Sequence, residues 1–379
     1  MLDNQFNKKS ENSAGLHILL TGGGTAGHVM PHLALYPKMK ELGWRVSYVG
    51  TKGMEKALVE SKGIPFYVIS AGKLRRYFSW QNFLDIFRLL LGLTQSAFIV
   101  FKIRPDIVFS KGGFVSVPIS VAAWLFRIPV LTHESDLTPG LANKILARFS
   151  KSIFYSFPET ASYLPRNKAI FTGLPIRQEL FKGEKDFGLK LCDFKKDDQR
   201  PILLFMGGSQ GAQRINSFVR ENLGKILLNY RVLHLCGKGK IDQKLKLCGY
   251  WQKDFAGEEL KHLLAISDYV ISRAGANSIY EILALKKPMI LIPLSVGSRG
   301  DQVLNAQSFK KQGLAEVIEE DNLEDSTFFN ALEELKKMQG SQFHQKNKLA
   351  STARNANELI LSSLQAQVYH EGKKLTLKS

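Results

Sequence analysis

Residues 16–28, Leu-His-Ile-Leu-Leu-Thr-Gly-Gly-Gly-Thr-Ala-Gly-His, decide the fold of the first half of the chain. A short apolar run, Leu16–Leu20, opens into three glycines and then into a helix start. In α/β domains this order brings backbone N–H groups against an anionic ligand. Residues 201–212, Pro-Ile-Leu-Leu-Phe-Met-Gly-Gly-Ser-Gln-Gly-Ala, repeat the order. One such turn is a weak signal, but two of them predict two doubly wound domains that face each other across a cleft.

Short apolar runs alternate with helical segments on both sides of this pattern, which predicts parallel sheets with helices on both faces. In the first half, strands are expected at 16–20, 46–49, 66–69, 107–109, 130–132 and 152–155, and helices at 29–42, 55–61, 80–101, 115–126 and 141–149. In the second half, strands are expected at 202–206, 232–235, 269–272, 289–292 and 315–318, and helices at 211–228, 258–265, 278–285, 302–312 and between 325 and 364.

The segments outside this alternation are polar. Residues 1–15 lack the apolar stretch of a signal peptide and are expected to form a flexible leader. Residues 182–200 are rich in charge and show no apolar period, which predicts a solvated connection between the domains. The basic tail from Gln365 is expected to fray.

The chain is basic, with 52 Lys and Arg against 34 Asp and Glu and a formal net charge of +18. This excess favours an anionic partner, which could be a nucleic acid, a nucleotide or an acidic membrane surface. The three cysteines, Cys192, Cys236 and Cys248, show no C-x-x-C spacing. A zinc site or a disulfide framework is therefore not expected.

The longest apolar stretch, Phe83–Ile103, is interrupted by charged residues and is too broken to span a membrane. Its helical spacing fits a helix packed on the core or one that lies on a membrane surface. The preceding residues 73–80 place three cations before three aromatic side chains. That composition suits a lipid headgroup interface or a loop that binds a phosphorylated substrate.

Candidate site residues follow the predicted strands, at the edge where open α/β sheets bind ligands. The turns concerned are Gly22–His28, Ser110–Phe114, His133–Asp136, Gly207–Gly211, Arg273–Asn277 and Ser298–Gln302. The first turn lacks the Lys-Ser/Thr of a P-loop, and no acidic residue closes the next strand as in a dinucleotide site.

Four positions in or beside these turns carry the chemistry, and each has a structural alternative. His28 stands at a helix start, where it could act as a general base or simply pack. His133-Glu134 could bind substrate hydroxyls or form a satisfied turn. Glu281 could accept the hydroxyls of a ribose or lie on a helix surface, and Asp301 could contact a sugar or cap its helix.

Together these motifs resemble those of the bacterial N-acetylglucosaminyltransferases that make lipid II. The resemblance runs from Leu16 to about Ile360, and it adds Asn305-Ala306 to the residues above. It implies an inverting glycosyltransferase of the GT-B type, built from two Rossmann-like domains and needing no metal or other cofactor. Its substrates would be UDP-N-acetylglucosamine and undecaprenyl-pyrophosphoryl-N-acetylmuramoyl-pentapeptide (lipid I), whose 4-hydroxyl accepts the sugar.

The resemblance also implies domain limits and residue roles. Residues 16–175 would bind the acceptor and the membrane, residues 176–340 would bind the donor, and residues 341–365 would cross back to the first domain, followed by the tail 366–379. His28 would be the base. The acceptor pyrophosphate would meet Thr25, Ala26, Gly27, Gly112 and Gly113. The donor would meet Asp136, Arg177, Gly208, Ser209, Gln210, Phe255, Ala256, Ala276, Asn277, Glu281, Asp301 and Gln302.

Two positions depart from the family pattern. Many members carry Gln-Asn where this chain has Ser135-Asp136, and Gln-Gln where it has Asp301-Gln302. The sugar contacts of Asp136 and Asp301 are the ones that these departures affect.

A lipid acceptor implies an enzyme held peripherally at the cytoplasmic face of the plasma membrane, on anionic lipid. Three alternatives remain open. The chain could be another glycolipid glycosyltransferase of the same fold, a UDP-N-acetylglucosamine epimerase, or a basic nucleic-acid-binding protein. No RNP-type or KH signature supports the last, so no nucleic-acid partner is expected.

Overall fold

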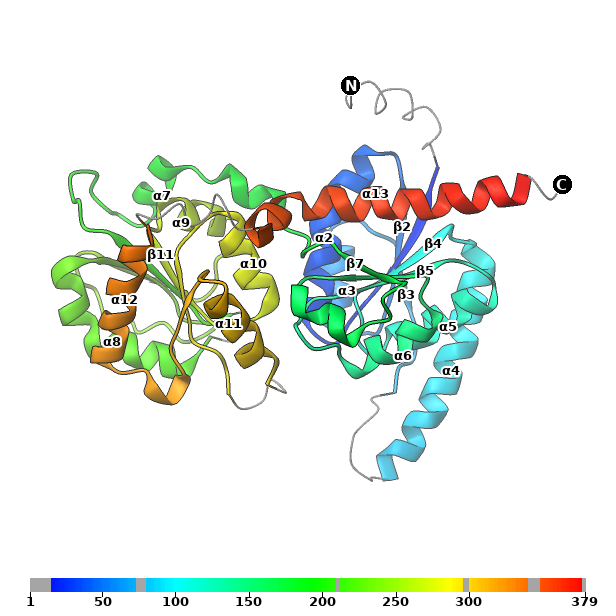
Figure 1. The fold of residues 1–379 in the computed structure, drawn as a ribbon. Coiled ribbons are helices and arrows are strands. Elements are labelled where there is room, and N and C mark those ends of the chain that lie inside the picture. Colours follow the sequence, from blue (N-terminus) through cyan, green and yellow to red (C-terminus); the bar gives the residue numbers. More distant parts are fainter. Residues whose placement is uncertain (1–14, 73–79, 209–210, 296–299, 340–347, 377–379) are drawn as a thin grey trace, which may run out of the picture. The chain divides into compact units, whose positions relative to one another are not determined.

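The computed structural model describes residues 15–72, 80–208, 211–295, 300–339 and 348–376. The chain divides into two compact units (Figure 1). Unit 1 comprises Met1–Ile176 and Asn355–Ser379, and unit 2 comprises Arg177–Arg354. The chain therefore leaves unit 1, builds unit 2 and returns to unit 1.

Unit 1 is built on a seven-stranded sheet in the order β3-β2-β1-β4-β5-β6-β7. All neighbouring strands are parallel, so their carboxyl ends lie at one edge. The strands are β1 (His17–Thr21), β2 (Arg45–Gly50), β3 (Phe66–Val68), β4 (Ile107–Ser110), β5 (Val130–Glu134), β6 (Ser152–Tyr155) and β7 (Ala169–Phe171).

Helices pack on the sheet of unit 1 through apolar side chains that are fully removed from solvent, such as Leu35, Ile119 and Leu146. They are α2 (Ala26–Glu41), α3 (Met54–Glu60), α4 (Trp80–Ile103), α5 (Ser116–Leu125), α6 (Leu141–Phe149) and the short η2 (Pro158–Tyr163). The last helix, α13 (Lys348–Thr376), places Ile360, Leu361 and Leu364 in the same core as β1 and α2. This helix continues past Gln365, so the prediction that the tail frays from there is wrong.

The side chain of Asn357 on α13 pairs with the backbone of Ile176. Its Oδ1 accepts from the Ile176 N–H at 2.8 Å, and its Nδ2 donates to the Ile176 carbonyl, also at 2.8 Å. Both groups are buried. This two-bond contact joins the residue at which the chain leaves unit 1 to the helix by which it returns.

Unit 2 is built on a second parallel sheet, with six strands in the order β10-β9-β8-β11-β12-β13. The strands are β8 (Ile202–Met206), β9 (Arg231–Leu235), β10 (Tyr250–Lys253), β11 (Tyr269–Ser272), β12 (Met289–Leu291) and β13 (Glu316–Val317). The helices are η3 (Gln178–Lys182), α7 (Lys185–Leu191), α8 (Gln213–Asn229), α9 (Leu260–Ile266), α10 (Ala276–Ala284), α11 (Asp301–Lys311), η4 (Glu320–Asn322) and α12 (Asp325–Gln339).

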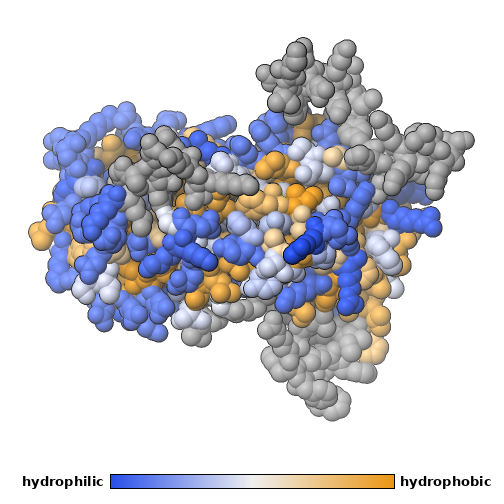
Figure 2. All heavy atoms as spheres, in the orientation of Figure 1, coloured by the Kyte–Doolittle hydropathy of each residue, from blue (hydrophilic) through white to orange (hydrophobic). Residues whose placement is uncertain are grey.

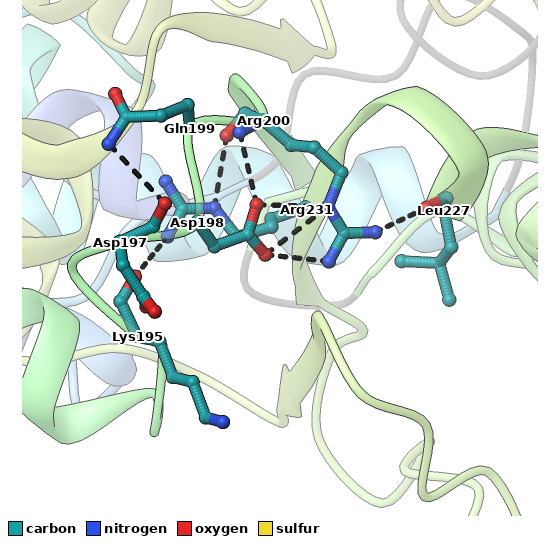
Figure 3. Close-up of polar contacts among 7 residues, drawn as sticks. All are labelled: Lys195, Asp197, Asp198, Gln199, Arg200, Leu227 and Arg231. Carbon is teal, nitrogen blue, oxygen red and sulfur yellow. Dashed lines mark hydrogen bonds and ion pairs between the residues drawn. The ribbon is translucent and has the colours of Figure 1, made fainter.

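The charge-rich run 182–200 is not the solvated connection that its composition predicts. It contains α7, and Cys192 and Phe194 behind this helix are buried. Beyond them, Arg231 donates to the Lys195 carbonyl at 3.1 Å and to the Arg200 carbonyl at 3.0 Å (Figure 3). Arg200 itself pairs with Asp198. The side chain of Arg231 on β9 therefore fastens this run to the sheet of unit 2 through the carbonyl groups of the run.

Candidate active site

Three of the predicted turns lie at the carboxyl edge of the sheet of unit 1. They follow β1, β4 and β5, which are neighbours in that sheet. The first two turns touch, because a Cβ at Gly22 would lie 3.3 Å from the Lys111 Cβ and a Cβ at Gly113 would lie 2.6 Å from the Gly23 carbonyl oxygen. Gly112 and Gly113 have φ of +84° and +82°, which L side chains rarely adopt. Glycine is thus required both by the contact and by the backbone.

His28 lies in the first turn of α2, close to both glycine turns. Its Nδ1 is 3.0 Å from the Gly23 carbonyl oxygen and 3.1 Å from Thr25 Oγ1, and a Cβ at Gly113 would be 3.5 Å away. A carbonyl oxygen can only accept, so Nδ1 carries the hydrogen in this contact. In the neutral ring the lone pair is then on Nε2, which is the form that a general base needs.

The acceptor residues Thr25, Ala26 and Gly27 form the start of the same helix. Thr25 is the N-cap with extended backbone, and α2 begins at Ala26. The positive end of a 16-residue helix therefore stands at the first glycine turn. This arrangement favours an anion at the edge of the sheet.

In the turn after β5, the polar groups form hydrogen bonds with one another. Such a satisfied turn is the alternative to a site for substrate hydroxyls that the sequence left open. The Glu134 carboxylate accepts from the Asn143 side chain at 2.7 Å and from the backbone N–H groups of Gly140 and Asp136 at 3.0 and 3.1 Å. Burial raises the pKa of Glu134 to about 7, and Asp136 adds to the rise. Ser135 and Asp136 are half-buried, so a ligand could still meet them.

The carboxyl edge of the sheet of unit 2 carries the second glycine turn. A Cβ at Gly207 would lie 2.4 Å from the Ala212 nitrogen, and one at Gly211 would lie 2.0 Å from the Cys236 carbonyl oxygen. Gly208 has φ of +82°. The turn leads into the 17-residue α8, whose N-terminus favours an anion. The predicted donor residues Ser209 and Gln210 lie outside the described residues.

Glu281 and Arg177, which the sequence placed separately on the donor, lie together. Arg177 Nε and Nη2 donate to the two carboxylate oxygens of Glu281 at 2.7 and 2.9 Å. The side chains are 19% and 14% exposed. A bidentate pair of this kind fixes both planes. Each carboxylate oxygen keeps a second lone pair, so the pairing leaves acceptor capacity for hydroxyl groups.

The remaining donor residues of unit 2 gather near the same edge. Ala276 and Asn277 begin α10 after β11, and Phe255 and Ala256 follow β10. Phe255 is exposed and Ala256 is buried. The positive end of α10 thus stands beside the glycine turn that follows β8, because β8 and β11 are adjacent.

Asp301 is not the N-cap of α11, so the capping role that was the alternative to a sugar contact does not apply. The N-cap is Gly300, with φ of +79°, and Asp301 is the first helical residue and buried. The side chain of Gln302 accepts from the Leu294 N–H at 3.1 Å, and Asn305 donates to the Ala274 carbonyl at 3.2 Å. These contacts tie α11 to the turn after β11 and to the segment after β12.

Sequence reasoning missed the side chain that links the turns of unit 1. Lys111 lies between Ser110 and Gly112 and is almost fully buried, at 1% exposed. A lysine between an apolar strand and a Gly-Gly pair is the signal that could have singled it out. Among the described residues, no three His, Cys, Asp or Glu side chains gather in a way that could hold a metal ion.

Two family models match the chain. The glycosyltransferase family 28 N-terminal domain matches residues 18–155, and the glycosyltransferase family 28 C-terminal domain matches residues 202–360. The first match lies within unit 1, and the second covers unit 2 from residue 202 onward together with residues 355–360, which belong to unit 1.

Curated relatives are similar over nearly the whole chain. A protein of Clostridium novyi (strain NT) is 50% identical over 92% of this chain and 98% of its own length. It is named UDP-N-acetylglucosamine--N-acetylmuramyl-(pentapeptide) pyrophosphoryl-undecaprenol N-acetylglucosamine transferase. A protein of Bacillus cereus (strain ATCC 14579) with the same name, numbered 2, is 48% identical over 92% of this chain and 98% of its own length.

Among solved structures, MurG of Acinetobacter baumannii matches with a TM-score of 0.68. The match covers 93% of this chain and 99% of that one, at 24% identity. At this identity the likeness concerns the fold, two Rossmann-like domains with parallel sheets.

Proposed function

This chain belongs to glycosyltransferase family 28, and on that premise we propose how its two units share one reaction. The enzyme transfers N-acetylglucosamine from UDP-N-acetylglucosamine to undecaprenyl-pyrophosphoryl-N-acetylmuramoyl-pentapeptide, which makes lipid II. Both substrates carry a pyrophosphate group. The observation that supports the division is that each unit has its own glycine turn at the carboxyl edge of its own parallel sheet.

Unit 2 binds the donor in this proposal. Gly207, Gly208 and the N-termini of α8 and α10 bind the diphosphate, which becomes the leaving group. Backbone N–H groups and helix dipoles stabilise its developing charge, since they are already oriented and need no reorganisation. Glu281 accepts the ribose hydroxyls, Phe255-Ala256 meets the uracil, and Asp301 and Gln302 meet the sugar. Asp136 of unit 1 is a further donor contact.

Unit 1 binds the acceptor. Its pyrophosphate lies at residues 25–27 and at Gly112–Gly113, where two glycine turns and the start of α2 meet. His28 Nε2 removes the proton from the 4-hydroxyl as that oxygen attacks the anomeric carbon and the bond to the diphosphate breaks. The configuration at that carbon inverts, because the oxygen enters opposite the leaving group.

The function is tested by transfer of radiolabelled N-acetylglucosamine from UDP-N-acetylglucosamine onto a lipid I analogue, with and without EDTA. We expect labelled lipid II in both conditions, because the groups proposed at the diphosphate are backbone N–H groups and helix ends. Product that vanishes with EDTA would contradict the metal-free mechanism. Donor binding without any transfer would favour another acceptor or an epimerase.

An apolar face on unit 1 supports binding to a membrane surface. It consists of exposed side chains, each between 45% and 66% accessible, on α4 (Phe87, Leu90, Leu91, Phe98, Phe101) and at the end of α5 (Trp124, Leu125, Phe126). The rings of Phe101 and Phe126 are 6.4 Å apart, so the two groups are continuous. Part of this face is visible at the right-hand edge of Figure 2. The predicted interface loop, residues 73–79, lies outside the described residues.

The apolar face and the net charge of +18 together suit a membrane whose interior is apolar and whose headgroups are anionic. Within the part of the chain that the structure describes, no helix is both long and apolar enough to cross a bilayer. We place the enzyme at the cytoplasmic face of the plasma membrane, attached peripherally, where the lipid acceptor is held.

We expect the double variant Phe98→Ser/Leu125→Ser to bind vesicles of anionic phospholipid at least about tenfold more weakly than wild type, because each apolar side chain contributes about 1.5 kcal/mol or more when buried. Sedimentation with such vesicles measures this. Leu228→Ser, which changes an apolar side chain that is 75% exposed on unit 2, is the control and should bind normally. Vesicle binding that is unchanged by the double substitution, by salt and by the charge of the lipid would refute the proposal.

A further inference from the structure

Lys111 is a buried cation beneath the ligand edge of unit 1. It follows β4 directly, its backbone N–H donates to the Thr21 carbonyl at 2.9 Å, and its side chain is 1% exposed. The next two residues are the left-handed Gly112 and Gly113 of the proposed acceptor site. Lysine is almost never fully buried without a partner, so its contacts require an explanation.

The Lys111 ammonium group joins the turn after β4 to the turn after β5. Its Nζ lies 2.6 Å from His133 Nδ1 and 2.7 Å from Ser135 Oγ. His133 Nε2 lies 2.8 Å from the Gly173 carbonyl oxygen, so Nε2 carries the ring hydrogen and Nδ1 accepts. Lys111 therefore donates to both partners. One side chain fixes His133 and Ser135 relative to the glycine turn.

Charged groups from three neighbouring segments face Lys111. Glu134 at the end of β5 and Asp136 beyond it raise its pKa. The pKa values of His133 and of His32, which lies on α2, are lowered first by burial and then by the charge of Lys111. Burial outweighs the two acids and lowers the pKa of Lys111 to about 7. The positive charge of Lys111 is thus partly balanced by these two acidic groups.

The lowered pKa means that Lys111 costs stability. An unfolded lysine keeps its ordinary pKa of 10.5, so the unfolded chain holds the proton more tightly at this site. Stability therefore rises as the pH increases from about 7 to 10.5, and below about 7 the cost is complete. An apolar side chain of similar length would avoid this cost. A destabilising charge at a ligand edge is typical of a residue kept for function.

We propose that Lys111 is a positioning residue for glycosyl transfer, which holds the half-buried Ser135–Asp136 turn against the Gly112–Gly113 turn so that both meet their substrates in one geometry. The inference rests on the proposed function. It assigns a role to the motif Ser-Asp at 135–136, because Lys111 donates to the serine and balances the charge of the aspartate.

The test compares Lys111→Met, Asp136→Asn and the double variant, with Lys40→Met as the control for the same substitution on an exposed lysine of α2. Lys111→Met should lower kcat/KM for transfer to a lipid I analogue by roughly 10- to 100-fold, the effect of losing hydrogen bonds from a charged group. The double variant removes one charge of each sign. Its loss should be at least about tenfold smaller than the product of the two single losses.

Two further readouts separate positioning from a general loss of structure. Lys111→Met should unfold at the same or higher urea concentration than wild type at pH 7, and it should lose the rise in stability between pH 7 and 10.5. Wild-type kcat/KM should fall as the pH rises through the region where Lys111 loses its proton, and this component should be absent in Lys111→Met. Lys111→Arg, which stays charged, should retain activity to higher pH than wild type.

The inference would be overturned if the loss of kcat/KM in the double variant equalled the product of the two single losses. It would also be overturned if Lys111→Met had the same pH profile of kcat/KM as wild type. A loss of kcat/KM in Lys111→Met that is accompanied by an equal loss in the free energy of unfolding would also overturn the inference, because it would indicate a structural role alone. If wild type makes no lipid II, the proposed function fails. The coupling between Lys111 and Asp136 in urea unfolding then still tests the contact itself.

Discussion

Replacing His28 by alanine is expected to lower kcat for lipid II formation by about 10²- to 10⁴-fold, the range that a positioned general base contributes. The expected result depends on geometry. Since Nδ1 donates to the Gly23 carbonyl, the ring is held by one nitrogen and presents the lone pair of the other. Removal of the ring takes away the base but leaves both glycine turns in place, so the KM values should change little.

Steady-state kinetics on a lipid I analogue measure this effect. The matched control is Thr25→Val, which removes the second Nδ1 contact at 3.1 Å but keeps the bond to Gly23. We expect it to lower kcat by less than about tenfold, since one hydrogen bond contributes about 1 kcal/mol. A kcat within threefold of wild type for His28→Ala would show that another group is the base.

Replacing Glu281 by alanine is expected to weaken donor binding by roughly 10- to 150-fold, because hydrogen bonds to a charged group contribute about 1.5–3 kcal/mol. The substitution also leaves Arg177 without its bidentate partner. Since that guanidinium is 19% exposed, solvent screens part of the cost, and we expect a loss of about 1–3 kcal/mol in stability.

Calorimetric titration with UDP-N-acetylglucosamine separates the two effects, provided that it is carried out below the unfolding transition of the variant. Glu316→Gln is the control, because Glu316 is a carboxylate of unit 2 with 16% side-chain exposure and a lysine partner at 3.6 Å. It should leave donor affinity unchanged. Normal affinity in Glu281→Ala would refute the ribose assignment, and normal stability would show that the ion pair contributes nothing.

The sequence predicted most elements of the fold because apolar runs and glycines mark them locally. It missed β7 (Ala169–Phe171) and β10 (Tyr250–Lys253), which are short and only partly buried, so their apolar pattern is weak. The sequence predicted a solvated connection at 182–200 because this run is rich in charged residues. That composition does not indicate that Cys192 and Phe194 are buried or that Arg231 donates to carbonyl groups of the run.

The candidate site was predictable where it consists of backbone. The glycine turns and the helix starts follow from local sequence, and the structure places them at the carboxyl edges of the two sheets. Contacts between side chains were not predictable. Arg177 and Glu281 are 104 residues apart, and Lys111 and Ser135 are 24 apart, so no spacing rule joins them. Lys111 and Ser135 meet because they follow β4 and β5, which are neighbours in a parallel sheet, whereas Arg177 before η3 meets Glu281 on α10.

The path of the chain has a consequence for synthesis on the ribosome. The sheet of unit 1 leaves the ribosome before unit 2, yet Ile360, Leu361 and Leu364 of its core and the Asn357 partner of Ile176 are made after unit 2. Unit 2 is one continuous segment, complete once Arg354 has emerged. The nascent chain therefore carries an unfinished first unit while the second acquires its whole core. The acceptor half can acquire its full core only after α13, which is synthesised later than the whole of unit 2, has left the ribosome, so the onset of activity depends on this helix.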